Sequence, residues 1–315
     1  MIVAACQHEK TKKHGKDAKG NQRTRCVTCG KTFIDKPETA YGNLRITDRE
    51  AATALGMLLE GMAIRSVERL TGLHRDTLCD LVLRVGQKCA RFLSATVIDV
   101  EAEDIQCDEI WSFVGCKQKH RVAEGYTPDF GDSWTFIAVE RTTKLVLAYE
   151  IGDRSHYTTK SFLHKVANAT TGHFQISTDG SNSYTNMVPF IFGSRCDFGQ
   201  IIKNYQSSQS VTRYSPAKII SSEKRAVFGS PDWGRVCTSH VERLNLTLRM
   251  TMRRFTRLTN GYSKSVKHHA AMQGLFFAYY NFCRKHETIK QTPAQASGLA
   301  EKQWTILELL ERISK

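Results

Sequence analysis

The chain has 315 residues, of which 41 % are hydrophobic and 24 % charged, a composition that is typical of globular proteins and excludes a wholly disordered chain. The net charge of +14 favours a polyanionic partner such as nucleic acid. No run approaches the roughly 18 consecutive apolar residues of a membrane helix, and the first residues do not resemble a secretory signal. We therefore expect a cytoplasmic protein with no membrane partner, built from two domains and a small appendage.

The first 33 residues are rich in lysine and arginine and end in a Cys-x-x-Cys-Gly sequence at Cys26–Gly30. Two thiolates on one tight turn provide half of a tetrahedral zinc site, and the glycine permits the positive φ of that turn. Upstream, position 9 is a glutamate where a second Cys-x-x-Cys pair needs a cysteine. Residues 1–36 are predicted to form a zinc-ribbon-like module, with a basic arm that holds no metal as the alternative. Its predicted ligands are Cys6, His8, Cys26 and Cys29. The other cysteines are scattered and are expected to be free thiols in a reducing cytosol.

Residues 45–95 carry helical signals. Thr47, followed three residues later by Glu50, is typical of a helix start, and this helix is expected to reach about residue 60. Two further helices are predicted at 64–71 and 75–85, separated by a short turn that begins with Gly72, and the second has Leu78, Leu81, Val82 and Val85 on its inward face. This is the helix-turn-helix layout, in which the N-terminal residues of the second helix face DNA. Those residues include Arg75 and Thr77. A small helical bundle without a role in DNA binding is the alternative.

From about residue 100 the pattern changes to that of strands. Strands are predicted at 105–114, 134–139, 144–151, 174–178 and 200–203, and helices at 158–169, 184–192, 238–255 and 270–285. The order βββαβαβα is a ribonuclease-H-like plan. The predicted fold class is therefore α/β, with a mixed sheet in a catalytic core at 100–290, a loop at 204–216, and a C-terminal helical tail at 291–315. The aromatic residues between Phe276 and Phe282 are expected in the core.

Three carboxylates lie at informative places in this plan. Asp108 is in the middle of the first strand, Asp179 ends the fourth, and Glu242 is in the helix at 238–255. The first and fourth strands are neighbours in a ribonuclease-H-like sheet, so the two aspartates can converge. Carboxylates that lie close together repel, and divalent metal relieves the repulsion. Oxygen ligands suit Mg²⁺ or Mn²⁺, and two such ions support phosphodiester displacement. Taken singly, each acid can instead be a turn former, an edge residue or a surface group.

Three stretches resemble DDE transposases of the IS1 type, a group of insertion-sequence transposases: Cys107–Gly115, Ser177–Gly180 and Thr238–Arg249. Two more segments, Met252–Lys264 and Tyr279–Arg284, are similar to the same group, so the resemblance covers nearly the whole chain. It implies that Asp108, Asp179 and Glu242 form a metal-binding catalytic triad. The family's first Cys-x-x-Cys is replaced here by the sequence Cys6-Gln-His-Glu9.

The resemblance also implies a DNA contact near the cleaved bond at Arg249, where many members of the group carry lysine. Asn245 and Arg249 lie on the same helical face as Glu242. Further arginines follow, and helical spacing predicts that Arg253 shares a face with Arg249 while Arg254 lies nearby. Phosphate contact is favoured for this cluster over a merely solvated helix face. Its members are Arg243, Arg249, Arg253, Arg254 and Arg257.

The function implied is that of a transposase that binds the terminal inverted repeats of an insertion sequence. It frees a 3′-hydroxyl at each end, and that hydroxyl attacks target DNA in a second metal-dependent phosphoryl transfer. Two Mg²⁺ or Mn²⁺ ions are the expected cofactors. The partners are double-stranded DNA and further copies of the chain, in a dimer or larger assembly associated with the nucleoid of a prokaryote. The alternatives are a domesticated DNA-binding regulator and a ribonuclease-H-like nuclease or resolvase.

Overall fold

A computed structural model describes residues 6–16, 22–34, 39–125, 127, 129–205, 219–256 and 259–314. The chain divides into two compact units, residues 1–39 and 40–315. The predicted loop at 204–216 falls outside these ranges except for its first two residues, which continue a strand, and Arg257 also falls outside them. Within the described ranges, every helix is too short or too polar to cross a bilayer.

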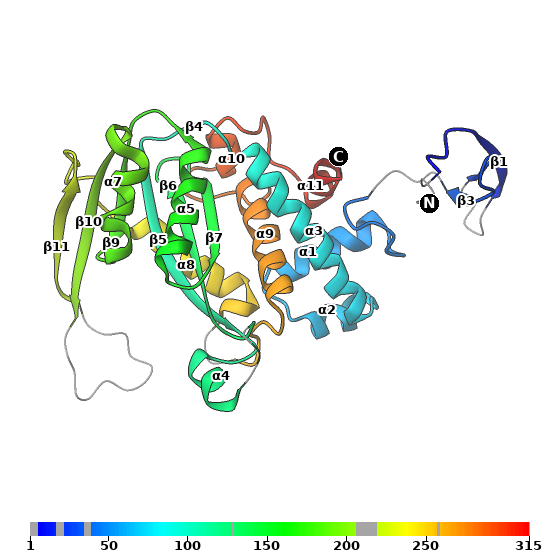
Figure 1. The fold of residues 1–315 in the computed structure, drawn as a ribbon, viewed down its shortest axis with the longest axis horizontal. Helices are drawn as coiled ribbons and strands as arrows, with labels where there is room; N and C mark the ends of the chain where they lie inside the picture. Colours follow the sequence, from blue (N-terminus) through cyan, green and yellow to red (C-terminus); the bar gives the residue numbers. More distant parts are fainter. Residues whose placement is uncertain are drawn as a thin grey trace, which may run out of the picture. The chain divides into compact units, whose positions relative to one another are not determined.

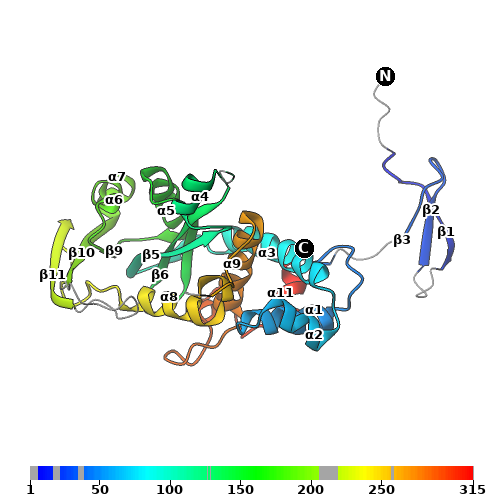
Figure 2. The same ribbon diagram turned by 90° about the horizontal axis from the view of Figure 1, so that it is seen from below.

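The first unit holds a small antiparallel sheet whose strand order is β1-β2-β3 (Figures 1 and 2). The strands are β1 (Thr11–Lys16), β2 (Gln22–Cys26) and β3 (Thr32–Ile34). Directly after β2, Gly30 adopts a φ of 72° and its N–H donates to the carbonyl of Cys26 at 3.1 Å. The predicted tight turn is therefore present, and glycine provides its left-handed residue.

The second unit begins with the helices α1 (Asp48–Leu59), α2 (Ile64–Thr71) and α3 (Arg75–Thr96). The predicted capping box of α1 is confirmed, because Thr47 and Glu50 each accept a hydrogen bond from the other's backbone N–H. Gly72 ends α2 with a φ of 73°, so the short turn before α3 is where the sequence predicts it. The four apolar residues predicted to face inward from α3 are all buried.

Two details of these helices differ from the prediction. The helix α3 continues for 11 residues beyond Val85, because Cys89 and Leu93 on the same face are buried as well. Leu70 shares the helical spacing of the buried Val67, yet its side chain is 64 % exposed. A short turn thus joins α2 to α3, and an apolar side chain of α2 is left in solvent.

A six-stranded mixed sheet forms the centre of the second unit, in the order β11-β10-β9-β5-β6-β7 (Figure 1). Its strands are β5 (Asp104–Val114), β6 (Gly131–Glu140), β7 (Val146–Gly152), β9 (Phe174–Asp179), β10 (Cys196–Tyr205) and β11 (Ile219–Phe228). The predicted three-stranded meander is confirmed as the antiparallel strands β5, β6 and β7, and β9 pairs in parallel with both β5 and β10. This topology fits the predicted ribonuclease-H-like plan.

Strand β11 was not predicted, and β10 is longer than predicted. β11 pairs antiparallel with β10 at the edge of the sheet. The described side chains of β11 are nearly all exposed. An edge strand without a buried face lacks the apolar alternation by which a strand is recognised.

Helices cover both faces of the sheet (Figure 2). One face carries α5 (His156–Ala169), α6 (Asn182–Thr185) and α7 (Met187–Phe192), and the other carries α8 (Ser239–Thr251) and α9 (Val266–Phe282). The smaller elements are α4 (Gln118–Glu124), η1 (Gly193–Arg195), η2 (Arg253–Phe255), α10 (Pro293–Ala296), α11 (Ile306–Ile313) and the paired short strands β4 (Val100–Glu101) and β8 (Thr170–Thr171).

The helix predicted at 238–255 is shorter than expected. It ends at Thr251, because Met252 is extended with a φ of −105° and a ψ of 105° and buries its side chain completely. Arg253 and Arg254 then lie on the 3₁₀ turn η2 rather than on α8. The predicted helical face shared by Arg249 and Arg253 is therefore not formed.

Helix α9 is held against the sheet by a row of buried polar side chains. His269 contacts the hydroxyls of Ser112 and Ser263 at 3.2 and 2.8 Å, and burial lowers the pKa of its ring to about 3. Further along, Gln273 accepts a hydrogen bond from Thr135, and the amide of Asn281 pairs with the backbone of Val146. The aromatic residues of the same helix are buried as predicted, except that Tyr279 is only partly covered.

Helices α3 and α9 approach each other closely at two glycines. A Cβ added to Gly86 meets the carbonyl oxygen of Ala271 at 2.0 Å, and one added to Gly274 meets the carbonyl oxygen of Gly86 at 2.6 Å. The backbones of the two helices leave no room for a side chain. The N-terminal helices therefore pack tightly, through α3, against α9 and so against the sheet that α9 covers.

We expect Gly86→Ala to destabilise the protein by about 1–3 kcal/mol, because the two helices must separate to admit the methyl group. A lowered midpoint of urea unfolding would measure the effect. The same substitution at Gly72 is not a matched control, since its φ is positive. Ser94→Ala on the exposed side of α3 is the better comparison and is expected to be nearly neutral.

Candidate active site and metal centres

The two predicted aspartates lie side by side at the centre of the sheet. Strands β5 and β9 run parallel, with Gln106 opposite Ser177 as their last paired residues. Asp108 and Asp179 each lie two residues beyond that pair, so their side chains meet where β9 ends. Their carboxylate oxygens lie within 4.8 Å of each other. The structure therefore brings together the two strand carboxylates predicted from the sequence.

A third carboxylate, Glu109, joins this cluster and was missed in the sequence. One of its oxygens lies within 4.8 Å of those of Asp108 and Asp179. Its carboxylate accepts hydrogen bonds from the Tyr184 hydroxyl at 2.6 Å and from Arg154 at 2.9 Å. Because successive residues of a strand point to opposite faces, Asp108 approaches from the α8 face and Glu109 from the face covered by α5–α7.

Helix α8 is fixed to β5 by two side-chain contacts. The amide oxygen of Gln106 accepts hydrogen bonds from the backbone N–H groups of His240 and Val241, at 2.9 and 3.3 Å, which caps the start of the helix. Just over one turn further on, the amide nitrogen of Asn245 donates to the Asp108 carboxylate at 2.8 Å. Asn245, a predicted site residue, is thus in direct contact with the carboxylate cluster.

Glu242, the third predicted acid, lies close to the cluster but is not part of it. Its side chain is 44 % exposed and is paired with the ammonium of Lys203 on β10. The Glu242 oxygen that contacts Lys203, Oε1, also accepts a hydrogen bond from the Thr238 hydroxyl at 2.7 Å. Its charge is nevertheless among the groups that raise the pKa of Asp108. The Glu242 carboxylate is therefore held by a lysine of the protein itself. Glu242 lies one turn of α8 before Asn245.

The Asp108 carboxyl has a pKa raised to about 7, first by burial and then by the charges of Asp179 and Glu109. Burial likewise raises the pKa of Glu109. A cluster in which carboxylates suppress each other's ionisation is what a divalent cation relieves. The amide oxygen of Asn245 is buried beside Asp108 and has no hydrogen-bond partner among the described residues. Hard oxygen donors and an unmatched acceptor fit Mg²⁺ or Mn²⁺.

We expect Asp108→Asn to stabilise the metal-free protein at pH 8 but much less at pH 5. The folded pKa lies above the unfolded value, so the folded state holds a proton that the unfolded state loses, and stability falls as pH rises from about 4 to 7. Removing the carboxylate removes this penalty, which is on the order of 1–3 kcal/mol at pH 8. Thermal unfolding in EDTA at both pH values measures it. Equal shifts at pH 5 and pH 8 would contradict the assignment.

The predicted DNA-contacting residues differ in their exposure and in the elements that carry them. Arg75 is exposed at the first residue of α3, with Thr77 half-buried beside it. Arg249 is half-buried near the end of α8 and Arg253 is exposed on η2. Arg254 is half-buried, and its guanidinium donates to the Ser263 hydroxyl at 3.2 Å. These side chains do not form one continuous row.

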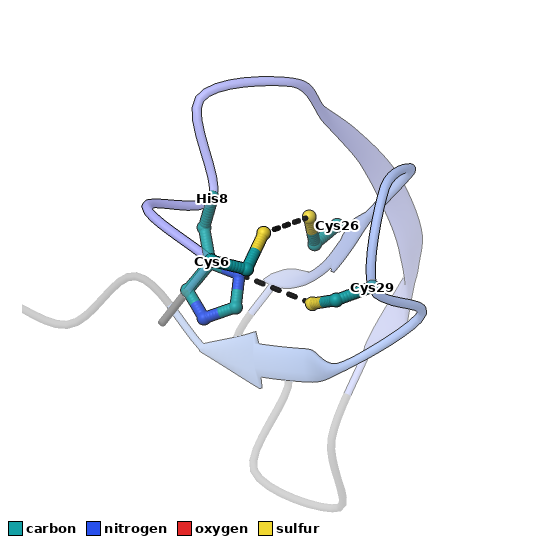
Figure 3. Close-up of side chains that lie close together, drawn as sticks. All are labelled: Cys6, His8, Cys26 and Cys29. Carbon is teal, nitrogen blue, oxygen red and sulfur yellow. Dashed lines mark hydrogen bonds between the residues drawn. The ribbon is translucent and has the colours of Figure 1, made fainter. Parts of the chain in front are cut away.

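The four predicted zinc ligands come together in the first unit (Figure 3). The sulfur atoms of Cys6 and Cys26 are 3.7 Å apart, and the sulfur of Cys29 lies 3.3 Å from Nδ1 of His8. Tetrahedral zinc with bonds of about 2.3 Å separates its sulfur ligands by roughly 3.8 Å. The donor set and its spacing therefore fit zinc, with His8 in the place of a fourth cysteine.

Local backbone geometry favours the thiolate form at this cluster. The backbone N–H of Cys29, with help from His8, lowers the pKa of Cys26 to about 6. By contrast, the pKa of Cys6 is raised. His8 has a φ of 58°, unusual for a residue with a side chain, and its ring packs against Phe33 with centroids 5.4 Å apart. A strained residue held at a ligand position is common at functional sites.

No family model matches the chain. Among solved structures, a piggyBac transposase synaptic complex with hairpin DNA aligns over 85 % of this chain and 70 % of its own, with 10 % identity and a TM-score of 0.36. A likeness of that size carries no argument. Among curated sequences, the insertion element iso-IS1n protein InsB of Shigella dysenteriae is 25 % identical over 177 residues, which cover 56 % of this chain and 95 % of the relative. The resemblance to transposases of the IS1 type, predicted from the motifs of the chain, is confirmed by this relative.

Proposed function

We propose that this chain is a DNA transposase that binds the terminal inverted repeats of an insertion sequence and performs metal-dependent strand cleavage and strand transfer. The observation that carries the proposal is the meeting of Asp108 and Asp179 at the end of β9, beneath a helix that carries Glu242 and Asn245. The net charge of +14 and the similarity to InsB support a DNA substrate.

Asp108 and Asp179 would hold the catalytic metal ions, with Glu242 as the third carboxylate. When bound, two Mg²⁺ or Mn²⁺ ions supply charge that activates the attacking oxygen and stabilises the leaving oxygen of the phosphodiester. The residues of the chain do the positioning. Asn245 orients the Asp108 carboxylate, and Lys203 holds the Glu242 carboxylate beside it. Arg249, on the same helix, would contact the phosphate next to the cleaved bond.

Recognition of the element ends would fall to the N-terminal parts of the chain. In a helix-turn-helix, the start of the second helix reads base edges in the major groove. Arg75 is the exposed first residue of α3, and Thr77 follows on the same turn. The basic first unit would add zinc-stabilised contacts to DNA. Because two ends must be held together, the active form would be a homodimer or larger, acting in the cytoplasm at the nucleoid.

We expect Arg75→Ala to relax the preference for end DNA over unrelated duplex, because a base contact is worth about 1–3 kcal/mol of discrimination. Competition binding with the two duplexes measures the ratio. Arg91→Ala, an exposed arginine in the second half of α3, is the matched control and should leave the ratio unchanged. Equal weakening on both duplexes would make Arg75 a phosphate contact instead.

One experiment tests the proposed function as a whole. Purified protein is incubated with Mg²⁺, labelled DNA from the ends of the element and an unlabelled target plasmid. Joined products support a transposase. Cleavage without joining identifies the nuclease or resolvase alternative, and end binding without cleavage identifies a DNA-binding regulator; either result would overturn the proposal.

A further inference from the structure

A cavity of about 620 Å³ lies where the N-terminal helices meet the segment after α8. That size is within the range of about 300–1,000 Å³ that is typical of small-molecule sites. Its apolar wall is formed by Leu58 of α1, Met62 of the loop between α1 and α2, Ile64 of α2 and Met272 of α9. The carboxylate cluster, the four zinc ligands and Arg75 are not among the residues that line it. The cavity is therefore distinct from the carboxylate cluster and the zinc ligands, and it includes two of the predicted DNA-contacting arginines, Arg253 and Arg254.

Cations surround this apolar wall. Arg65, Arg253, Arg254 and Lys264 line the cavity, and none of its described lining residues is acidic. Arg65, Arg253 and Lys264 are exposed and mark the opening toward solvent. An apolar wall with a wholly cationic border is complementary to a ligand that joins a flat apolar group to an anion.

Arg254 is the cation set deepest in this border. Burial lowers the pKa of its guanidinium, which donates a hydrogen bond to the neutral hydroxyl of Ser263. No carboxylate lies within 4.0 Å of it in the part of the chain that the structure describes. A buried guanidinium without an anion is costly, because desolvation is not offset by attraction. The planar fork of arginine suits a phosphate in this position.

We propose that this cavity takes up one unstacked nucleotide of the DNA substrate, with its base against Met62, Ile64 and Met272 and its phosphate at Arg254. The inference rests on the proposed function and adds a DNA contact at residues outside the carboxylate cluster. Thioether side chains adapt to the face of any base. His268, whose pKa is lowered by burial and is therefore neutral at pH 7, and Asn260 provide hydrogen-bonding groups for the edge of the base.

The geometry favours a nucleotide over other occupants. A fully paired duplex can present its phosphates to Arg253 and Lys264, but its stacked bases cannot reach the apolar wall. An apolar side chain from a second copy would fill the wall and leave Arg254 without an anion. Extruding a base requires unpairing and unstacking, which is least costly at a mismatch, a nick or a strand end. Such positions arise wherever a strand has been cleaved.

Three duplexes of one sequence test the proposal, in Ca²⁺ so that no strand is cut. The first is fully paired, the second carries a single extrahelical adenine, and the third has an abasic residue in place of that adenine. The full-length protein is expected to bind the extrahelical adenine about tenfold more tightly than the paired duplex, with the abasic probe in between. Equal affinity for the paired and the extrahelical probes would overturn the proposal. Equal affinity for the abasic and the adenine probes would also overturn it, because the cavity would then hold phosphate alone.

Variants connect the preference to the cavity. Ile64→Trp fills the apolar wall and should reduce the preference for the extrahelical adenine to within twofold, with affinity for paired DNA unchanged. Lys264→Ala should weaken both non-paired probes, and Arg254→Met should weaken them further if its thermal unfolding matches that of the parent. Met250→Trp, at a 69 % exposed position on α8, is the control for an added indole. A preference that survives Ile64→Trp, or an oligomer that dissociates in this variant, would assign the cavity to another occupant.

Failure of this inference can be told apart from failure of the proposed function. Strand transfer with Mg²⁺ is measured on the same preparations. Joining of DNA ends without any preference for the extrahelical base would overturn the cavity proposal alone. A preference for the extrahelical base without cleavage or joining would support the cavity proposal and overturn the catalytic one.

Discussion

Asp108→Asn, Asp179→Asn and Glu242→Gln are each expected to abolish cleavage and strand transfer, with losses on the order of 10³-fold or more, equivalent to about 4 kcal/mol of transition-state stabilisation. Each substitution keeps the size of the side chain and removes one negative charge. Hard divalent ions bind charged oxygen ligands best, so the metal site is weakened while the fold survives. The three losses should not add, because the residues act as one metal-holding unit.

Binding and catalysis should separate in these variants. Each is expected to shift end DNA in a gel as well as the parent or better, since removing a carboxylate lessens repulsion of phosphate. Glu223→Gln on the exposed strand β11 is the control for Glu242→Gln and should retain activity. Glu109→Gln tests whether Glu109 or Glu242 is the third metal ligand. If it abolishes joining while Glu242→Gln does not, Glu109 is the third ligand and the assignment of Glu242 is wrong.

Lys203 on β10 accounts for where the Glu242 side chain lies. Its ammonium pairs with the Glu242 carboxylate, which is therefore held close to Asp108 without joining the cluster.

The sequence predicted those parts of the fold whose geometry is set by residues that are close together in the chain. The capping box at Thr47 fixes the start of α1 through contacts within four residues. The tight turn at Gly30 requires a positive φ that favours glycine. The proximity of Asp108 and Asp179 could be predicted from the sequence because the order of strands places β5 next to β9. Their side chains then lie close together where β9 ends.

Features that depend on partners distant in the sequence could not be predicted in the same way. Glu109 follows Asp108 on the opposite face of β5 and joins the cluster only because β9 ends beside it. Gln106 has no motif, yet it caps α8 across the sheet. The end of α8 at Thr251 is set by burial of Met252, although the helical pattern of the sequence continues beyond it. Tertiary packing overrides local pattern at each of these places.

Cys26→Ser and Cys29→Ser are expected to remove zinc from the protein and to lower end-specific binding, while non-specific nicking in Mn²⁺ continues. Loss of one of four ligands reduces zinc affinity by at least about 10–100-fold. The ligands lie in residues 1–39, which form a compact unit of their own, so the carboxylate cluster should be unaffected. Zinc content by mass spectrometry and the two DNA assays measure these effects. Cys116→Ser, outside the cluster, is the control. Equal losses in end binding and in nicking would contradict this division of roles.

The role of His8 can be separated from that of the cysteines. His8→Ala should release zinc, whereas His14→Ala should not, because His14 lies on the exposed strand β1 and is outside the cluster. In the metal-free cluster the pKa of Cys26 is about 6, so protons compete with zinc for this ligand increasingly below that pH. Zinc affinity, and with it binding of end DNA, should therefore weaken as the pH falls below 6. If His8→Ala retained zinc and end binding at pH 7.5, the site would need a different fourth ligand, and Glu9, which occupies the position of the missing cysteine, would be the next residue to replace.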